Sequence, residues 1–360
     1  MKIYAFYLPQ FHEISENNQW WGKGFTEWTN VKNSRSLFEG HMQPKHPLHN
    51  NYYNLLEYDT VKWQVETAKR YGIDGFVYYH YYFEGKLLLE KPAENFLKWK
   101  QLKHNYYFCW ANHSWIKSKG KTKKVLLEQT YGDENEWKRH FEYLLPFFRD
   151  ERYEKIDNKP VFMIFNKRFK EKNKMIKRFD EWCKQAGFAG IYIIESAILI
   201  TPWKKIGHRN IDSFLLREPN RAKFFYDMII RHKGLWKSML SNREDGLVVY
   251  DGDVIYDIMI KMMKKGKRIT HCVCFEWDNT PRHGINGYVI LPPHKEKIIE
   301  YLNCIKDEKM LIINAWNEWA EGMVLEPTQE NGYYYLEMIK KWKQKDNRDF
   351  VDRDWNEELR

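Results

Sequence analysis

Short apolar runs recur along the chain and are separated by longer stretches in which apolar residues return every three or four positions. The short runs are rich in β-branched and aromatic residues and indicate strands, whereas the longer stretches have the period of amphipathic helices. Eight runs predict strands: Ile3–Tyr7, Ile73–Tyr79, Tyr106–Ala111, Val161–Phe165, Ile191–Glu195, Ser213–Leu216, His271–Phe275 and Leu311–Ala315. Strands that alternate with helices in this way predict a parallel sheet covered by helices.

Helices are predicted in the stretches between the strands. Examples are Thr60–Tyr71, Glu134–Phe148, Lys174–Gly187 and Asp253–Lys264. Gly72 and Gly187 stand where a glycine would cap the end of a helix before the next strand. Eight such units predict an α/β protein, a single (β/α)8 TIM barrel with long βα loops over residues 1–345, followed by a charged C-terminal tail at 346–360.

The connection after the first predicted strand, residues 8–58, is unusually long and rich in Trp, His, Asn and Tyr. Long loops in compact domains tend to be functional, and the active site of such a barrel lies at the C-terminal ends of its strands. Polar and aromatic residues follow most of the predicted strands. We expect a substrate cleft lined by Tyr7, Gln10, His12, Glu27, Trp28, Tyr79, Trp110, Asn112, His113, Glu195, Asp278, Trp316, Asn317 and Trp319.

The most informative pair of residues is Glu318 and Glu321, which follow the last predicted strand. Carboxylates three residues apart lie on one face of a helical turn, about 5–6 Å apart at Cβ. Glycosidases that retain configuration hold two carboxyl groups about 5–5.5 Å apart, and crowding two acids raises the pKa of one of them. The pair therefore predicts a proton donor and a proton acceptor; an acidic surface turn is the alternative.

Two weaker signals each allow two interpretations. Glu27 can bind sugar hydroxyls or form an ordinary loop salt bridge. The segment from Asp278 to Arg282 can bring an acid and a cation into the cleft, or it can be a capped turn before Pro281.

Composition adds a preference for sugars. The chain has 16 Trp, 24 Tyr and 21 Phe, many of them in polar settings, and a ring beside hydrogen-bonding groups suits the C–H face of a sugar. The formal charge of +10 is spread along amphipathic stretches without a nucleic-acid-binding motif, so we expect no nucleic-acid partner. Attraction to an anionic glycan, a lipid-linked phosphate or a membrane surface is the functional reading of the charge.

We expect neither a metal nor a cofactor. The histidines lack zinc-ligand spacing, and no glycine loop of the phosphate-binding kind is present. Four of the five cysteines fall in apolar runs, which favours buried free thiols in a reducing compartment. The N-terminus does not have the pattern of a signal peptide, and no apolar run is long enough to cross a bilayer. A cytoplasmic location is therefore expected.

Several motifs together resemble the WbsX-type proteins of bacterial polysaccharide gene clusters, a family similar to the family 99 glycoside hydrolases. The matching segments are Phe6–His12, Trp21–Val31, Tyr71–Phe76, Trp110–Asn112, Asp278–Pro281 and Asn314–Gly322. The resemblance implies a (β/α)8 barrel that acts on α-linked, manno-configured glycans. It also implies an uncommon retaining mechanism, in which the 2-hydroxyl of the sugar attacks the anomeric carbon and gives a 1,2-anhydro sugar.

By this resemblance, Glu318 matches the base that acts on the 2-hydroxyl, and Glu321 matches the acid/base. Glu27 and Trp28 match the loop that lines the sugar cleft. The chain departs from the pattern at His113, where related sequences commonly have Glu, and at the basic stretch Lys117–Lys124. A substrate contact is therefore altered.

Three hypotheses follow: a metal-independent glycosidase or transglycosidase, a glycosyltransferase that needs an activated donor, and a non-catalytic glycan-binding protein, which His113 suggests. The expected partner is an oligosaccharide or lipid-linked glycan. Peripheral contact with the inner membrane and contact with polysaccharide assembly enzymes are further options.

Overall fold

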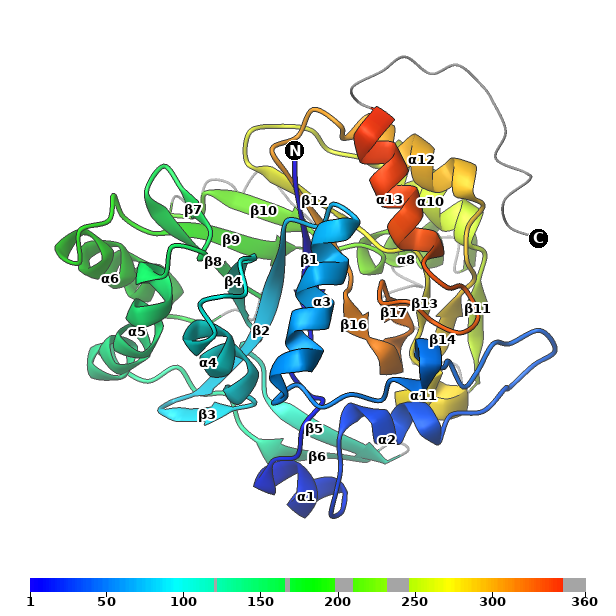
Figure 1. Cartoon of the computed structure of the whole chain (residues 1–360), viewed down its shortest axis with the longest axis horizontal. Helices are drawn as coiled ribbons and strands as arrows, with labels where there is room; N and C mark the ends of the chain where they lie inside the picture. Colours follow the sequence, from blue (N-terminus) through cyan, green and yellow to red (C-terminus); the bar gives the residue numbers. More distant parts are fainter. Residues whose placement is uncertain (120–121, 166–168, 198–209, 232–245, 346–360) are drawn as a thin grey trace.

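The computed structural model describes residues 1–119, 122–165, 169–197, 210–231 and 246–345. Eight parallel strands form its barrel (Figure 1). They are β1 (Lys2–Tyr7), β2 (Gly75–Phe83), β4 (Asn105–Trp110), β8 (Lys159–Ile164), β9 (Tyr192–Ala197), β10 (Ser213–Leu216), β12 (Ile269–Val273) and β15 (Met310–Ile313). Each strand pairs in parallel with the next along the chain, and β15 pairs with β1. The predicted (β/α)8 barrel is confirmed, and every predicted strand end lies within four residues of the observed one.

The barrel strands are buried on both faces because helices cover the outside and side chains fill the inside. All residues of β12 and β15 are buried, as expected for parallel strands. Aromatic rings fill much of the interior. Tyr4 of β1 meets Tyr107 of β4 with ring centres 5.1 Å apart, and Phe6 stacks on Tyr79 at 5.1 Å. Tyr79 of this stack also lines the cavity described next.

Helices surround the strands (Figure 1). They are α1 (Ser15–Trp21), α2 (Glu27–Lys32), α3 (Tyr58–Arg70), α4 (Lys91–Lys98), α5 (Glu134–Arg149), α6 (Lys172–Gln185), α8 (Asn220–Tyr226), α10 (Gly252–Lys261), α11 (Thr280–His283), α12 (Lys295–Cys304) and α13 (Tyr334–Lys345). Short turns are η1 (Leu48–Asn50), η2 (Asp227–Arg231), η3 (Gly284–Asn286) and η4 (Trp319–Glu321). The predicted helices correspond to α3, α5, α6 and α10. Gly72 and Gly187 follow α3 and α6 with φ of 81° and 95°, which confirms them as capping glycines.

Short additional strands lie in the loops. They are β3 (Lys86–Leu88), β5 (Trp115–Lys119), β6 (Thr122–Leu127), β7 (Lys155–Ile156), β11 (Val248–Tyr250), β13 (Trp277–Asp278), β14 (Tyr288–Ile290), β16 (Asn317–Glu318) and β17 (Met323–Val324). Two of these additions matter for the site. β5 and β6 form an antiparallel hairpin after β4, and β16 pairs with β17 after β15.

Three remaining expectations concern the tail, the cysteines and a membrane. The predicted tail, 346–360, lies outside the described residues. All five cysteines are free and four are buried, as predicted. Among the described helices, none has the length and apolar character needed to span a bilayer.

Candidate active site

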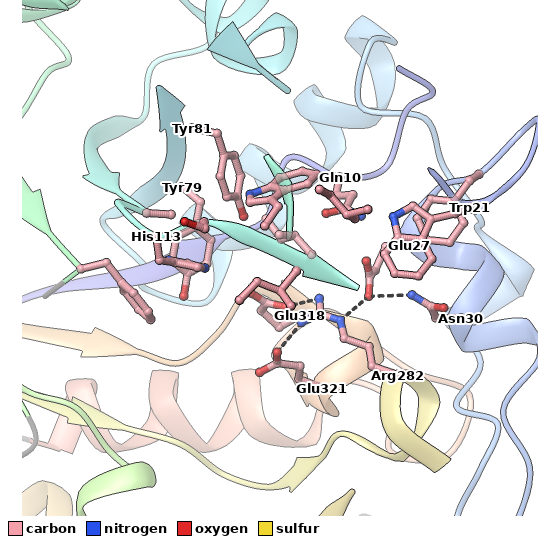
Figure 2. A pocket seen from close by; sticks show the side chains of 18 of the residues that line it. Gln10, Trp21, Glu27, Asn30, Tyr79, Tyr81, His113, Arg282, Glu318 and Glu321 are labelled. Carbon is pink, nitrogen blue, oxygen red and sulfur yellow. Dashed lines mark hydrogen bonds and ion pairs between the residues drawn. The ribbon is translucent and has the colours of Figure 1, made fainter. Parts of the chain in front are cut away.

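A cavity of about 560 Å³ opens at the C-terminal ends of the barrel strands. Its walls come from residues in or after β1, β2, β4, β8, β12 and β15, where the strand-end rule predicted a cleft. The polar lining side chains are Gln10, Glu27, Asn30, His113, Ser114, Arg282, His283, Glu318 and Glu321. The aromatic ones are Trp21, Phe25, Tyr79, Tyr81, Trp115 and Phe165. Figure 2 shows the cavity with both groups around it.

Glu318 and Glu321 lie on the same wall of this cavity because of the turn that carries them. Glu318 ends β16, and the 3₁₀ turn η4 runs from Trp319 to Glu321. Side chains three residues apart lie in line in a 3₁₀ turn, so the turn directs both carboxyl groups to one side. Gly322 ends η4 with φ of 68°, and a Cβ atom there would lie 2.7 Å from the backbone nitrogen of Asp278. Only glycine fits this close, left-handed position.

Arg282 of α11 connects three carboxylates at the centre of the site (Figure 2). Its Nε donates to Glu27 Oε1 at 2.7 Å, its Nη2 donates to Glu318 Oε2 at 3.1 Å, and its Nη1 donates to Glu321. The exposed fractions of the side chains are 24% for Arg282, 1% for Glu27, 7% for Glu318 and 22% for Glu321. One positive charge therefore faces three acids in a sheltered place.

Burial and crowding favour a proton on the acidic pair. Burial raises the pKa of Glu318 to about 8, with Arg282 opposing the rise and Glu321 and Glu27 adding to it. Burial also raises the pKa of Glu321, again against the effect of Arg282. The raised pKa of Glu318 favours a protonated carboxyl group at this position at neutral pH. Such a pair can donate a proton and accept another in the same cavity, which is the requirement of general acid–base chemistry.

The acidic turn rests on a buried scaffold. Asn317 donates from Nδ2 to the carbonyl of Leu8 and accepts from its amide at 2.7 Å, which joins β16 to the end of β1. Trp319 donates from Nε1 to Glu326 Oε2 at 2.8 Å, and Tyr53 and Gln64 donate to the same carboxyl group. Burial raises the pKa of Glu326 to about 7. These contacts fix the turn on its buried side and leave its two carboxyl groups facing the cavity.

Six of the residues predicted from sequence line the cavity: Gln10, Glu27, Tyr79, His113, Glu318 and Glu321. The other ten are not among the residues that line it, and most of them make contacts within the fold. Asn317 and Trp319 belong to the scaffold. Tyr7 faces α3, where its hydroxyl donates to Gln64 at 2.6 Å. Trp28 packs against Trp319 with ring centres 5.3 Å apart and donates to the carbonyl of Tyr53.

The other six of these ten residues are also buried. Trp316 is fully buried and lies 5.1 Å from the ring of Phe76, and His12 is 2% exposed. Trp110 donates to the carbonyl of Tyr82, and Asn112 accepts from the Tyr131 hydroxyl through its own carbonyl. Glu195 pairs with Lys172 at 2.6 Å, and it lies within β9 rather than at the predicted strand tip. Asp278 accepts from Gln43 at 2.6 Å and contacts His41 at 2.8 Å.

The sequence left the role of Arg282 open, and the structure places it at the centre of the acidic cluster. The list of expected cleft residues did not include the aromatic lining residues Trp21, Tyr81, Trp115 and Phe165. Their signal was present, because these aromatic residues stand next to polar ones after strand ends. No group of three or more His, Cys, Asp or Glu side chains with metal-binding geometry occurs in the part of the chain that the structure describes.

Comparisons with known proteins agree with this architecture. The sequence model of the family described as Glycosyltransferase WbsX matches residues 3–339, which confirms the resemblance found in the motifs. Two relatives named WxcX, from Xanthomonas campestris pv. campestris strains B100 and ATCC 33913, are 30% identical over 348 residues. The match covers 93% of this chain and 48% of each relative, so the chain spans about half their length.

Solved structures with the same fold are much more distant in sequence. The GH99 endo-alpha-mannosidase from Bacteroides thetaiotaomicron superposes with a TM-score of 0.53 at 12% identity, over 95% of this chain and 96% of its own. A structure described as a glycoside hydrolase-like protein gives a TM-score of 0.56 at 13% identity, over 95% and 93% of the two chains. At this identity the likeness concerns the fold.

Proposed function

The chain belongs to the family described as Glycosyltransferase WbsX, and on this premise we propose that it is a carbohydrate-active enzyme that acts on α-linked glycans of a bacterial surface polysaccharide. One observation carries the proposal: Glu318 and Glu321, both with raised pKa, face one aromatic-lined cavity. The fold-level likeness to a protein named endo-alpha-mannosidase favours a manno-configured sugar. The aromatic rings suit the apolar faces of sugars, and the carboxyl pair suits cleavage of a glycosidic bond.

In the proposed reaction the configuration at the anomeric carbon is retained. One carboxylate takes the proton of the 2-hydroxyl while O2 forms a bond to C1. The glycosidic bond breaks, and the other carboxyl group gives its proton to the leaving oxygen. Water or an acceptor hydroxyl then opens the 1,2-anhydro sugar at C1. The second carboxyl group now accepts the proton of the incoming hydroxyl, and the first returns a proton to O2.

The assignment of the two roles rests on the family resemblance, which makes Glu318 the base and Glu321 the acid/base. The electrostatics of the free protein favour the opposite distribution, because the pKa of Glu318 is raised to about 8 and a base must be ionised. We propose that the roles follow the resemblance and that the shared proton moves from Glu318 to Glu321 when sugar binds. A substrate with an activated leaving group separates the two assignments.

The function itself is tested with the purified chain, α-mannan fragments and neutral and acidic lipid-linked oligosaccharides. Mass spectrometry should detect released or transferred sugar. Glu321→Gln should lower the rate about 10²–10⁴-fold without changing the unfolding temperature. Glu142→Gln is the matched control, since its side chain is 60% exposed on α5. Equal rates for Glu321→Gln and the unaltered chain would remove the assignment of Glu321.

The role test uses an α-manno-configured disaccharyl fluoride, whose leaving group needs little protonation. Glu321→Gln should regain most of its activity on the fluoride, because only the acid is bypassed. Glu318→Gln should stay inactive, because the 2-hydroxyl still needs a base. Rescue of Glu318→Gln with an inactive Glu321→Gln would reverse the roles.

Transfer to an acceptor glycan is the second candidate, and the description of the family as a glycosyltransferase favours it. A transferase that uses the same cavity should turn over only with an activated donor. Sugar release from a glycan in the absence of any donor would exclude this candidate in favour of cleavage.

A further inference from the structure

Arg217, the residue that follows β10, lies beside the cavity and differs from the other buried arginines. Its guanidinium carbon is 4.9 Å from the ring centre of Phe165, which lines the cavity. The same ring meets His113, with centres 5.7 Å apart, and Tyr79, with centres 6.0 Å apart. Both of these residues also line the cavity. Arg217 therefore packs against Phe165, one of the residues that line the cavity, and is not itself a lining residue.

The guanidinium of Arg217 has no counterion within the described residues. Its Nε is buried and has no hydrogen-bond partner there, and no carboxylate lies within ion-pair distance of it in that part of the chain. Other sheltered arginines are fully engaged. Arg282 contacts three carboxylates, Arg152 binds Asp150 and four backbone carbonyls, and Arg221 binds Glu218.

An unpaired cation in a partly buried place is costly to the fold. Burial lowers the pKa of Arg217, which reflects the loss of water around its charge. Proteins normally pair such charges with an opposite charge or place them where a ligand of opposite charge can bind. The positive charge also reaches the catalytic pair, because it lowers the pKa of Glu321 as one of its smaller influences. A ligand that packs against Phe165 would therefore lie near the positive charge of Arg217.

Given the proposed function on which this inference rests, we propose that Arg217 forms an anion subsite that binds a carboxylate or phosphate group on the glycan. A guanidinium presents parallel N–H groups that match the oxygens of either anion. The neighbouring rings of Phe165 and Tyr79 would pack against the sugar that carries the anion. The substrate of this chain is accordingly an acidic glycan, and neutral mannan is a poorer ligand.

Binding experiments on the full chain test the subsite without any turnover. The probes are methyl α-D-mannopyranoside, the corresponding methyl mannosiduronate, and mannose 6-phosphate, titrated by calorimetry at low and high salt. At least one acidic probe should bind about 10–100-fold more tightly than the neutral one, which is the range of a hydrogen-bonded charge pair. The preference should weaken at high salt.

The variant Arg217→Gln should lose this preference and keep the affinity for the neutral probe, whereas Arg217→Lys should keep part of it. Because Arg217 has no partner to lose in the described structure, both variants should unfold at or above the temperature of the unaltered chain. Arg149→Gln on the exposed end of α5 is the control for the loss of one positive charge.

The acidic probe that is preferred identifies the anion, with the uronate indicating a carboxylate and the 6-phosphate indicating a phosphate. Equal affinities of the three probes, no measurable binding of either acidic probe at millimolar concentration, or an unchanged preference in Arg217→Gln would overturn the subsite. Failure of the catalytic proposal has a different signature. Glu321→Gln would then match the unaltered chain in rate while the preference for the acidic probe persists.

Discussion

Removal of Arg282 should reveal how strongly the acidic cluster depends on one cation. The substitution Arg282→Met keeps much of the side-chain length and deletes the charge. It leaves Glu27 and Glu318, which are 1% and 7% exposed, without their counterion. Removing one partner of a buried ion pair typically costs about 3–5 kcal/mol, because the other charge stays buried and uncompensated. We expect a loss of that size in the free energy of unfolding at pH 8.

The loss should depend on pH in a defined direction. A carboxyl group with a raised pKa in the folded state holds a proton that the unfolded chain has already released, so stability falls as pH rises towards the folded pKa. Arg282 limits this effect by lowering the pKa of Glu318 and Glu321. Without it both pKa values rise further, and the fall in stability extends to higher pH. The difference between variant and unaltered chain should therefore be smaller at pH 5 than at pH 8.

Urea unfolding at the two pH values measures these differences. Arg282→Lys should be intermediate, because it restores the charge without the fork that contacts three carboxylates. Arg149→Met, on the exposed end of α5, controls for the loss of one positive charge. A loss below about 1 kcal/mol at pH 8, or an equal loss at both pH values, would refute the reasoning about the cluster.

Three further predictions concern the scaffold and the cavity rim. The pKa of Glu326 is raised to about 7, so the free energy of unfolding should fall by about 3 kcal/mol on account of this group between pH 4.5 and 7. Glu326→Gln should remove that part of the pH dependence, and an unchanged curve of stability against pH would contradict this prediction. Gly322→Ala should lower the free energy of unfolding by at least about 1 kcal/mol, because a Cβ atom would push the turn of Glu321 away from Asp278. The same displacement should reduce kcat more than it raises KM. An unchanged kcat in a folded variant would count against this geometry. Trp21→Ala should raise KM with little change in unfolding temperature, because Trp21 lines the cavity and is 41% exposed. An unchanged KM would mean that Trp21 at the rim of the cavity does not bind sugar.

The barrel could be predicted because its signals are local. Apolar runs mark each strand, and capping glycines such as Gly72 end helices at the expected places. The same logic placed Glu318 and Glu321 at the end of the last strand. The 3₁₀ geometry that aligns them depends on Gly322 fitting against the backbone of Asp278, a contact between distant parts of the chain.

The sequence identified the wrong neighbours for several side chains because it shows order along the chain and not direction in space. Tyr7 and Tyr79 both sit near strand ends, yet Tyr7 faces α3 and Tyr79 faces the cavity. Trp319 stands between the two acids in sequence and points away from the cavity towards Glu326. The lack of a carboxylate beside Arg217 within the described residues is likewise a three-dimensional fact, because it depends on which side chains the fold brings near it.

The most direct test of the central claim is a titration of Glu318 itself. Carbon-13 labelling of glutamate carboxyl groups, with Glu318→Gln to identify the resonance, gives its pKa by NMR in the unaltered chain. We predict that this carboxyl group titrates at a pH of about 8, well above the ordinary value of 4.5, and that Glu321→Gln lowers the midpoint by removing a neighbouring negative charge. A midpoint near 4.5 that does not respond to Glu321→Gln would contradict a proton shared between the two acids.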